Sequence, residues 1–295
     1  MYNWLILPMN NTKVLMNLKF QFLIFSLIFF LGLPKLKAQT QALDTTSTWK
    51  RLGYDGASAF GGLKHAYSRP FHWKKDDFIT AGAIILGTGA LYAFDEESSD
   101  WFRNQEEDVP GIFKETGYYL GKPLYNYSIN GGVYLIGLFT KNEKWRKTGV
   151  LLISSATTVG LIQSVSKTFV GRARPIADVG KGSFKPFSNE AAYHSFPSGH
   201  TILAFTTFYA IGKQFKNPWA KGGFYTLGLL SPVTRLWSGA HWLTDVALSV
   251  AVSVVVVDSI DKYLNKERYP GIMSKDKISW RLQVGPGTIG LRGTF

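Results

Sequence analysis

The chain has 295 residues, which is long enough for one large domain or two small ones. Charged residues make up 18% and hydrophobic residues 45%, so the chain is too apolar for a disordered protein and low in charge for a soluble one. The net charge of +13 is spread over short clusters without a nucleic-acid-reading motif, and we expect no nucleic-acid partner. Because there is no cysteine, disulfides and thiolate metal sites are excluded.

The N-terminal residues 1–39 have the pattern of a secretory signal. Basic residues precede an apolar run, Phe20–Leu33, and the small residue Ala38 follows it. This order of basic, apolar and small residues predicts cleavage near Ala38. Two lysines between the run and Ala38, Lys35 and Lys37, fit an uncleaved anchor instead.

Residues 40–77 are polar and aromatic without a clear period, which indicates a leader at a membrane interface. Six apolar stretches follow within residues 78–265, the predicted helical domain. They are Phe78–Phe94, Tyr127–Thr140, Thr148–Ser166, Thr201–Gly212, Gly222–Leu230 and Asp245–Val257. The first and third approach the roughly 20 residues that cross a bilayer. The pattern predicts an all-α protein, a six-helix bundle embedded in a membrane.

The charges of the connecting loops indicate an orientation. Lysine and arginine gather between the second and third stretches, between the fourth and fifth, and after the sixth. The positive-inside rule places these loops in the cytoplasm, so the opposite ends of the stretches face the periplasm of a bacterial inner membrane. A cleaved signal would put residue 40 on the wrong side for six spans. A first stretch in the interface, an unprocessed signal or a soluble periplasmic bundle would each resolve that conflict.

The tail, residues 266–295, alternates loosely between apolar and polar residues near its end. Gly285-Pro286-Gly287 is a turn pattern between two possible strands. We expect a short C-terminal β-hairpin-like tail. One hairpin cannot close a membrane barrel, so a surface hairpin is the preferred interpretation.

His241 and Asp245 are four residues apart, a spacing that places two side chains on one helix face. Asp245 would accept a hydrogen bond from one ring nitrogen of His241 and leave the other unprotonated. Such a histidine can act as a nucleophile or a base. The alternative is a histidine at a helix start that is capped by an acid.

Pro197-Ser198-Gly199-His200 precedes an apolar stretch and is typical of a helix N-terminus with Ser198 near the cap. Backbone N–H groups at such an end bind anions, and Gly199 would let an anion approach closely. His200 would then lie beside that anion, where it could protonate a leaving oxygen. An ordinary Pro-Ser-Gly turn is the alternative.

Lys167, Arg174 and Arg235 supply positive charge next to these segments. An arginine fork binds two phosphate oxygens in its plane, and a lysine acts as a mobile point charge. Three such groups fit a site in which the protein itself neutralises a phosphoryl group. Basic side chains at a membrane edge would account for the charges, but not for the two histidines.

Together, and in this order, these segments closely resemble the signature of the type 2 phosphatidic-acid phosphatase family. That family includes non-specific acid phosphatases and vanadium haloperoxidases. The signature residues in this chain are Lys167, Arg174, Pro175, Pro197, Ser198, Gly199, His200, Arg235, His241 and Asp245. The resemblance covers about Phe78–Leu264. One departure is Thr234, where the family usually has serine, and threonine keeps the hydroxyl.

The resemblance implies a role for each of these residues. His241 would attack phosphorus and form a phosphohistidine, oriented by Asp245, and His200 would act first as general acid and then as general base. The phosphoryl oxygens would be bound by Lys167, Arg174, Ser198, Gly199 and Arg235. No metal and no cofactor are expected.

The resemblance also implies an activity, the hydrolysis of a lipid phosphate or diphosphate of the phosphatidate, polyprenyl diphosphate or lipid A type. A soluble periplasmic acid phosphatase, a vanadium haloperoxidase and a membrane protein with an idle pocket are the alternatives. The loops Ile176–His194 and Asp95–Lys122 would set specificity, with Arg172, Asp178 and His194 as candidates for leaving-group recognition. The sequence does not give the oligomeric state.

Overall fold

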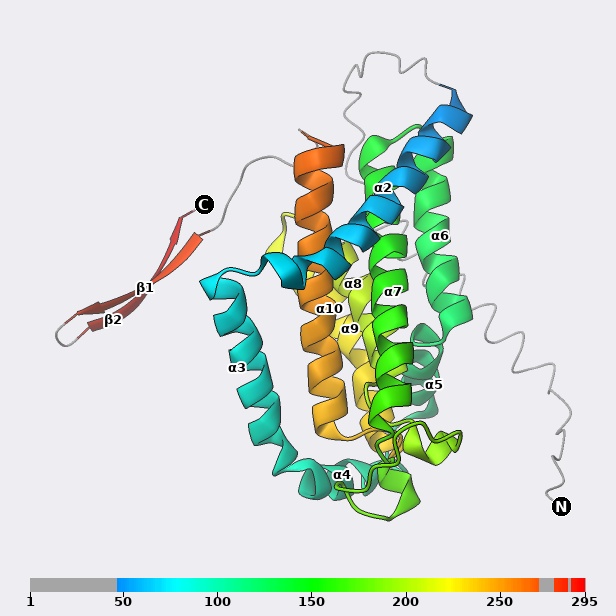
Figure 1. The fold of residues 1–295 in the computed structure, drawn as a ribbon, viewed down its shortest axis with the longest axis vertical. Coiled ribbons are helices and arrows are strands. Elements are labelled where there is room, and N and C mark those ends of the chain that lie inside the picture. The colour runs from blue at the N-terminus through cyan, green and yellow to red at the C-terminus, as the bar shows by residue number, and fades with distance from the viewer. Residues whose placement is uncertain (1–46, 271–278, 286–287, 295) are drawn as a thin grey trace, which may run out of the picture. The chain divides into compact units, whose positions relative to one another are not determined.

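The computed structural model describes residues 47–270, 279–285 and 288–294. The predicted signal or anchor, residues 1–39, lies outside the described residues. One compact unit spans Ser47–Phe295. Its described part contains nine α-helices (Figure 1), which are α2 (Thr48–Ser68), α3 (Lys75–Tyr92), α4 (Asp95–Arg103), α5 (Gly111–Leu120), α6 (Pro123–Phe139), α7 (Glu143–Val170), α8 (Gly199–Gly212), α9 (Pro218–Trp237) and α10 (Leu243–Tyr263).

The predicted helical class is confirmed, since residues 47–270 contain helices and no strand. Each of the six apolar stretches lies in one helix, namely α3, α6, α7, α8, α9 or α10. The count of six is wrong, because α2, α4 and α5 lie outside those stretches. Helix α2 buries the charged side chains of Arg51 and Asp55, and α4 begins with three acidic residues. Helices of this kind carry polar groups into contacts that an apolar run does not reveal.

Four short segments and two strands complete the described part. The short helical turns are η1 (Arg69–His72), η2 (Pro175–Ala177), η3 (Ala191–Tyr193) and η4 (Leu264–Arg268). Strand β1 (Ser279–Gly285) pairs antiparallel with β2 (Thr288–Thr294). Their register pairs Ser279 with Thr294 and Gly285 with Thr288.

Helix α8 lies in the centre of the helical unit, in contact with α6, α7, α9 and α10. Most of its side chains are buried, from Thr201 to Gly212, because the helix is apolar on every face. Helix α7 is buried along its first half and contacts α2, α6, α8 and α10. The core therefore forms around α7 and α8, and both helices end or begin at the same end of the unit, where residues 171–198 connect them.

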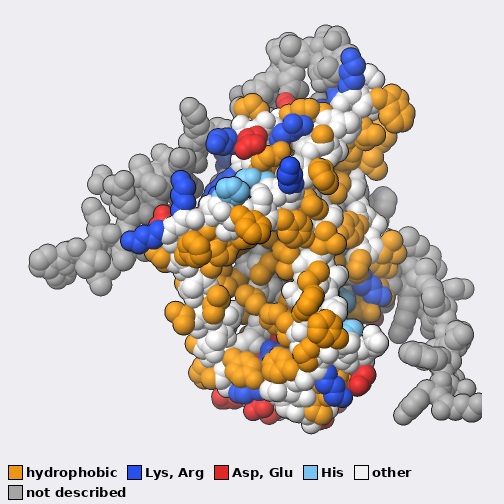
Figure 2. Space-filling view, in the orientation of Figure 1, with side chains coloured by type: hydrophobic (Ala, Val, Ile, Leu, Met, Phe, Trp, Pro, Cys, Tyr) orange, Lys and Arg blue, Asp and Glu red, His pale blue; other side chains and the backbone are white. Residues whose placement is uncertain are grey.

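Helix α3 differs from the others because none of its residues is buried, although residues 78–94 carry no charge. Large apolar side chains such as Ile85 and Leu86 are exposed along it. Figure 2 shows hydrophobic side chains gathered over this face of the unit, which is hollowed at its centre. Within the described residues, α7 and α10 with η4 are long and apolar enough to cross a membrane, and α3 joins them if its 64° bend into α4 belongs to one span. These helices are consistent with a membrane protein.

The end of the unit opposite the loop 171–198 is held by buried charges. Arg146 at the start of α7 binds Asp55 of α2 through two hydrogen bonds, at 2.8 and 3.0 Å. The same carboxylate accepts hydrogen bonds from the hydroxyls of Tyr134 and Tyr269. A buried ion pair is stable only when its remaining lone pairs are satisfied, and here four bonds satisfy this carboxylate. Asp55 therefore fixes α2 on the bundle.

Replacing Asp55 with alanine should leave the Arg146 charge buried and unpaired. We expect the free energy of unfolding to fall by about 3–5 kcal/mol. In a protein of this size, the midpoint of thermal unfolding should fall by on the order of 10 °C, as measured by circular dichroism in detergent.

Glu190→Ala is the matched control, because it removes an exposed carboxylate that is paired with Lys185 at 3.4 Å. Its midpoint should remain that of the unsubstituted protein, since exposed ion pairs contribute little. Equal midpoints for Asp55→Ala and Glu190→Ala would contradict the proposed stabilising role of Asp55.

Candidate active site

The segment after α7 turns back sharply at Gly171, which has the left-handed backbone angle φ of 57°. A Cβ atom at this position would lie 1.9 Å from the carbonyl oxygen of Lys185, so only glycine fits. The peptide group of Gly171 also accepts a hydrogen bond from the Lys185 N–H, at 2.7 Å. This close crossing of the chain places Arg172 and Arg174 directly behind Lys167, the basic residue in the last turn of α7.

His241 is buried in the segment between α9 and α10 and has a defined protonation pattern. Its Nδ1 lies 2.6 Å from the backbone carbonyl oxygen of Ser195. Burial and the positive charges of Lys167, Arg174 and Arg235 hold the pKa of His241 well below its usual value, so the ring is neutral. A carbonyl can only accept, and therefore Nδ1 carries the proton and Nε2 has a free lone pair. This is the form that a histidine nucleophile requires.

The expected hydrogen bond between His241 and Asp245 is not present, because Nδ1 and Oδ2 are 3.9 Å apart. Helix α10 begins only at Leu243, so His241 precedes it and the helical spacing rule does not apply. Asp245 instead accepts hydrogen bonds from the Ser195 hydroxyl and from the backbone N–H of Trp242. Asp245 therefore acts on His241 through Ser195, whose carbonyl binds the ring.

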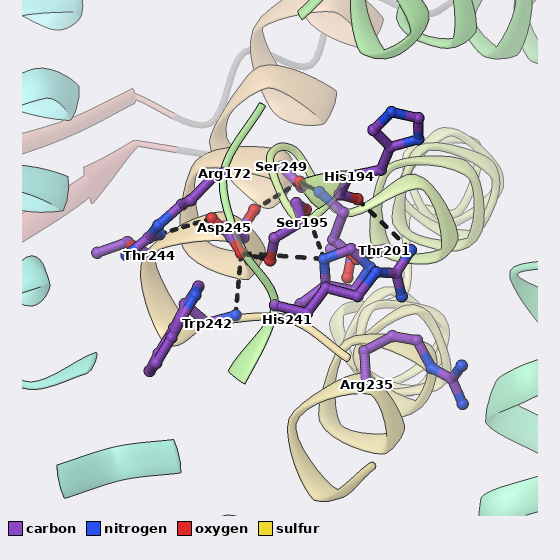
Figure 3. A network of polar contacts seen from close by, with 12 residues as sticks. Arg172, His194, Ser195, Thr201, Arg235, His241, Trp242, Thr244, Asp245 and Ser249 are labelled. Carbon is purple, nitrogen blue, oxygen red and sulfur yellow. Dashed lines mark hydrogen bonds and ion pairs between the residues drawn. The ribbon is translucent and has the colours of Figure 1, made fainter. Parts of the chain in front are cut away.

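Arg172 is buried between two carboxylates. Its NH1 group donates to Asp245, as Figure 3 shows, and its NH2 group donates to Asp95 at the start of α4, both at 2.7 Å. Asp95 also accepts hydrogen bonds from the backbone N–H and the hydroxyl of Thr244, at 2.9 and 2.6 Å. The expectation that Arg172 recognises a leaving group is wrong, because these acids and Thr244 already bind its guanidinium. Arg172 joins α4 and α10 behind the candidate nucleophile.

The two other leaving-group candidates also have partners. Asp178 lies at the surface and forms an ion pair with Arg103, at 3.3 Å. His194 points away from His241 in Figure 3, and its Nε2 is 2.8 Å from the carbonyl oxygen of Ser188. Neither side chain is aimed at the candidate active site.

The N-terminus of α8 contributes backbone groups to the same place. Ser198 is the N-cap residue, and its hydroxyl accepts from the N–H of Thr201 at 3.4 Å. Its own N–H donates to the hydroxyl of Ser249, at 3.0 Å. These bonds fix the first turn of α8, so that the amides of Gly199 and His200 are at the positive end of the helix dipole.

His200 lies among several cations. Its pKa is lowered to about 3 by burial and by the positive charges of Arg235, Lys167, Arg174 and Lys122. Within residues 47–270, the buried Nε2 of His200 and Nε of Arg235 have no hydrogen-bond partner. Buried polar groups are almost always paired, so an anion is the ligand that suits these two atoms. Charges from the first and third segments of the sequence motif, on Lys167, Arg174 and Arg235, thus act on the histidine of the second segment.

Arg174 is held in part by the backbone. Its Nε donates to the carbonyl oxygen of Ala191 at 3.0 Å, and burial lowers its pKa from the ordinary arginine value. Among the described residues the Lys167 ammonium forms no hydrogen bond or ion pair, and burial and the charge of Arg174 lower its pKa to about 8. Three residues with a part in this arrangement were not predicted, namely Asp95, Ser195 and Tyr118. Asp95 was visible only as one of many loop acids, whereas Ser195 and Tyr118 belong to no spaced motif.

In the described part of the chain, no three His, Asp or Glu side chains are placed to hold a metal ion.

The buried, neutral His241 thus lies near a second buried histidine that is itself surrounded by cations, and this arrangement suits an anionic substrate. Residues 148–267 match the family model described as the PAP2 superfamily. The chain is 36% identical over 198 residues to a lipid A 1-phosphatase of Rhizobium etli, covering 62% of this chain and 81% of that protein. The chain belongs to the PAP2 superfamily and is a phosphatase.

Two further relatives share shorter regions. A lipid A 1-phosphatase of Rhizobium johnstonii is 35% identical over 105 residues, which cover 35% of this chain and 42% of that protein. A lipid A 1-phosphatase of Porphyromonas gingivalis is 27% identical over 121 residues, which cover 39% of this chain and 24% of that protein. No solved structure matches the chain.

Arg172→Lys should keep a positive charge but lose the fork that contacts Asp95 and Asp245 together. Because Arg172 supports Ser195 and His241 without contacting substrate, we expect kcat to fall by about 10- to 100-fold with KM nearly unchanged. Steady-state release of phosphate measures both constants.

Lys181→Met is the control, since Lys181 joins the same loop to α4 through a surface ion pair with Glu96, at 4.0 Å. It should leave kcat unchanged. If Arg172→Lys raises KM and keeps kcat, Arg172 acts on substrate binding and the positioning role is wrong.

Binding of a dianion should bring a proton to His200. In the free enzyme His200 is neutral near pH 6, because its pKa is about 3. A bound dianion favours the charged imidazolium and raises that pKa, so the complex takes up a proton, and affinity falls as pH rises. Calorimetric titration with sulfate in two buffers of different ionisation heat counts this proton, and His200→Gln should abolish the uptake. If the unsubstituted protein releases a proton when sulfate binds, the predicted protonation of His200 is wrong.

Proposed function

We propose that this lipid phosphatase removes the 1-phosphate of lipid A, with His241 as the nucleophile. The relative from Rhizobium etli, which this chain matches over 81% of its length, supports the substrate. The observation that carries the chemistry is the free Nε2 of His241, because Nδ1 is engaged by the carbonyl of Ser195. A nucleophile in this form needs no base to activate it.

The phosphoryl group would be bound by the cations and the helix N-terminus. Lys167, Arg174 and Arg235 neutralise its charge, and the Gly199 amide and the Ser198 hydroxyl donate to its oxygens. The unpaired Nε of Arg235 supports this arrangement, since it lacks an acceptor within the described residues. Charge neutralisation by fixed groups is the main source of catalysis in phosphoryl transfer.

The reaction would proceed in two steps. The lone pair of His241 Nε2 attacks phosphorus, the bond between phosphorus and the leaving oxygen breaks, and protonated His200 gives its proton to that oxygen. Water then attacks the phosphorus of the phosphohistidine, His200 accepts a proton from that water, and the bond between phosphorus and His241 Nε2 breaks. Inorganic phosphate leaves, and the electron pair of the broken bond returns His241 to its neutral form. In both steps the Nδ1–H of His241 keeps donating to the Ser195 carbonyl. The negative charge of Asp245, which binds the Ser195 hydroxyl, stabilises the cationic ring.

We also propose that the active-site end faces the periplasm from the bacterial inner membrane. Helices α7 to α10 alternate in direction, so the connections that carry the site lie at one end (Figure 1). The opposite end carries the lysines and arginines of the α6–α7 and α8–α9 connections and of η4. The positive-inside rule supports a cytoplasmic position for that end, and the apolar helix α3 supports contact with lipid.

His241→Gln should abolish the reaction while the fold is kept, because glutamine can still donate to Ser195 but has no nucleophilic nitrogen. We expect kcat to fall by at least about a thousandfold. Purified protein is incubated with bis-phosphorylated lipid A, and mass spectrometry identifies which phosphate is lost.

Loss of the 1-phosphate with retention of the other phosphate supports the proposal. Full turnover by His241→Gln would exclude His241 as the nucleophile. Loss of phosphate from a soluble ester, with lipid A untouched, would exclude the lipid A substrate and leave the phosphatase assignment in place.

A further inference from the structure

The helix α5 lies against the candidate active site, although it is outside the residues that match the family model. Two glycines one turn apart let it approach closely. A Cβ at Gly121 would lie 2.6 Å from the Cβ of His200, and one at Gly117 would lie 2.4 Å from the side chain of Thr234. Any larger residue would push α5 away from α8 and α9. The position of α5 is therefore fixed with respect to His200 and to Arg235, which follows Thr234.

Tyr118 and Lys122 follow these glycines with the same spacing and lie next to His200. The Tyr118 ring stacks on the His200 ring, with the centroids 5.2 Å apart and 22° between the planes. The guanidinium carbon of Arg235 is 4.9 Å from the Tyr118 centroid, and the Lys122 ammonium is 4.4 Å from it. One electron-rich ring thus has two cations and an imidazole around it.

These two cations have no acidic partner. Among the described residues, neither Lys122 nor Arg235 forms an ion pair with a carboxylate. The charge of Glu106 is near enough to act on the pKa of Arg235, in the direction that raises it, but Glu106 forms no ion pair with Arg235. Like charges held together in a half-buried place are unfavourable unless an anion lies between them. The tyrosine rings stabilise Lys122 only in part, so its ammonium remains able to bind an anion.

The contacts of Lys122 indicate whether it lies near His241, the candidate nucleophile, or near His200, the candidate general acid. The Lys122 ammonium contacts the Tyr118 ring, and that ring stacks on His200, the candidate general acid. The positive charge of Lys122 is among the causes that lower the pKa of His200. In an in-line displacement the nucleophile and the leaving oxygen are on opposite sides of phosphorus. Lys122 therefore lies on the leaving-group side.

We propose that Lys122 binds an anionic group of the leaving group next to the scissile bond, such as the second phosphate of a lipid diphosphate, and that Tyr118 positions His200 beside it. This inference rests on the proposed function, in which His200 faces the leaving oxygen. The Lys122 ammonium is 4.4 Å from the centroid of the Tyr118 ring, and that ring stacks on His200 with the centroids 5.2 Å apart, so a single ring separates the ammonium from His200. Lys122 is then the residue that distinguishes a diphosphate from a monophosphate.

The test compares two lipids that differ only at this group. Lipid A carrying a diphosphate at position 1 and lipid A carrying a single phosphate there are hydrolysed by the unsubstituted protein and by Lys122→Met. Methionine keeps most of the length and removes the charge. We expect kcat/KM for the diphosphate to fall by about 10- to 100-fold and kcat/KM for the monophosphate to fall by less than about threefold. An equal loss for both lipids would overturn the proposal.

Lys114→Met is the matched control on the same helix, because the Lys114 ammonium binds the backbone oxygen of Glu106 and does not face the site. It should change neither value. A second arm measures binding without turnover, as the dissociation constants of inorganic pyrophosphate and of orthophosphate by calorimetry. Lys122→Met should weaken pyrophosphate about 10-fold or more and leave orthophosphate nearly unchanged.

The two arms separate the two hypotheses. If the unsubstituted protein hydrolyses neither lipid, the lipid A substrate is wrong, and the pyrophosphate arm still decides the role of Lys122. Equal affinities for pyrophosphate in Lys122→Met and the unsubstituted protein would exclude the subsite. Tyr118→Leu should lower kcat and shift its pH profile for both lipids, because it frees the ring of His200. An unchanged profile would exclude the positioning role of Tyr118.

Discussion

Arg172 lies between two carboxylates that come from different helices, Asp95 at the start of α4 and Asp245 in the first turn of α10. None of these three charges could be buried alone, since each would lose its hydration without compensation. The loop after α7, the bend between α3 and α4, and the start of α10 must therefore assemble together. Asp245 then holds the Ser195 hydroxyl, and the Ser195 carbonyl orients His241. The reactivity of one histidine nitrogen thus depends on an ion pair that never contacts substrate.

The side chains whose charges act directly on His241 are mainly cationic, in contrast to the two carboxylates that surround Arg172. The positive charges of Lys167, Arg174 and Arg235 act on His241, and buried ring and guanidinium atoms of His200 and Arg235 lack partners among the described residues. Burial, together with this surplus of positive charge, lowers the pKa of both imidazoles and keeps them neutral. In the proposed mechanism the neutral form of His241 is the reactive one. For His200 it is not, and the negative charge of the phosphate itself would protonate the general acid when the substrate binds.

Much of the site could be predicted from sequence, because its residues occur in short segments with fixed spacing. What could not be predicted is which partner each side chain meets. Arg172 and Arg174 look alike in sequence, yet Asp95, distant in the chain, binds only the first. The spacing of His241 and Asp245 suggested a shared helix face, but α10 begins after His241. In the fold, the six apolar stretches gave six helices. The three others, α2, α4 and α5, depend on tertiary contacts such as the pair of Asp55 with Arg146.

Helix α5 shows why those contacts matter for substrate choice. The family model matches residues 148–267, which supply every residue of the phosphate-binding motif. Helix α5 ends before that region, at Leu120, and reaches the pocket only because Gly117 and Gly121 allow backbone contact with α8 and α9. The matched region thus supplies the groups for the proposed phosphoryl transfer, including Arg235, whose guanidinium also contacts the Tyr118 ring. Tyr118 and Lys122, which lie next to His200, come from the segment before that region. If Lys122 binds the leaving group as proposed, discrimination between leaving groups resides in a segment outside the matched region, which Gly117 and Gly121 hold against Thr234 and His200.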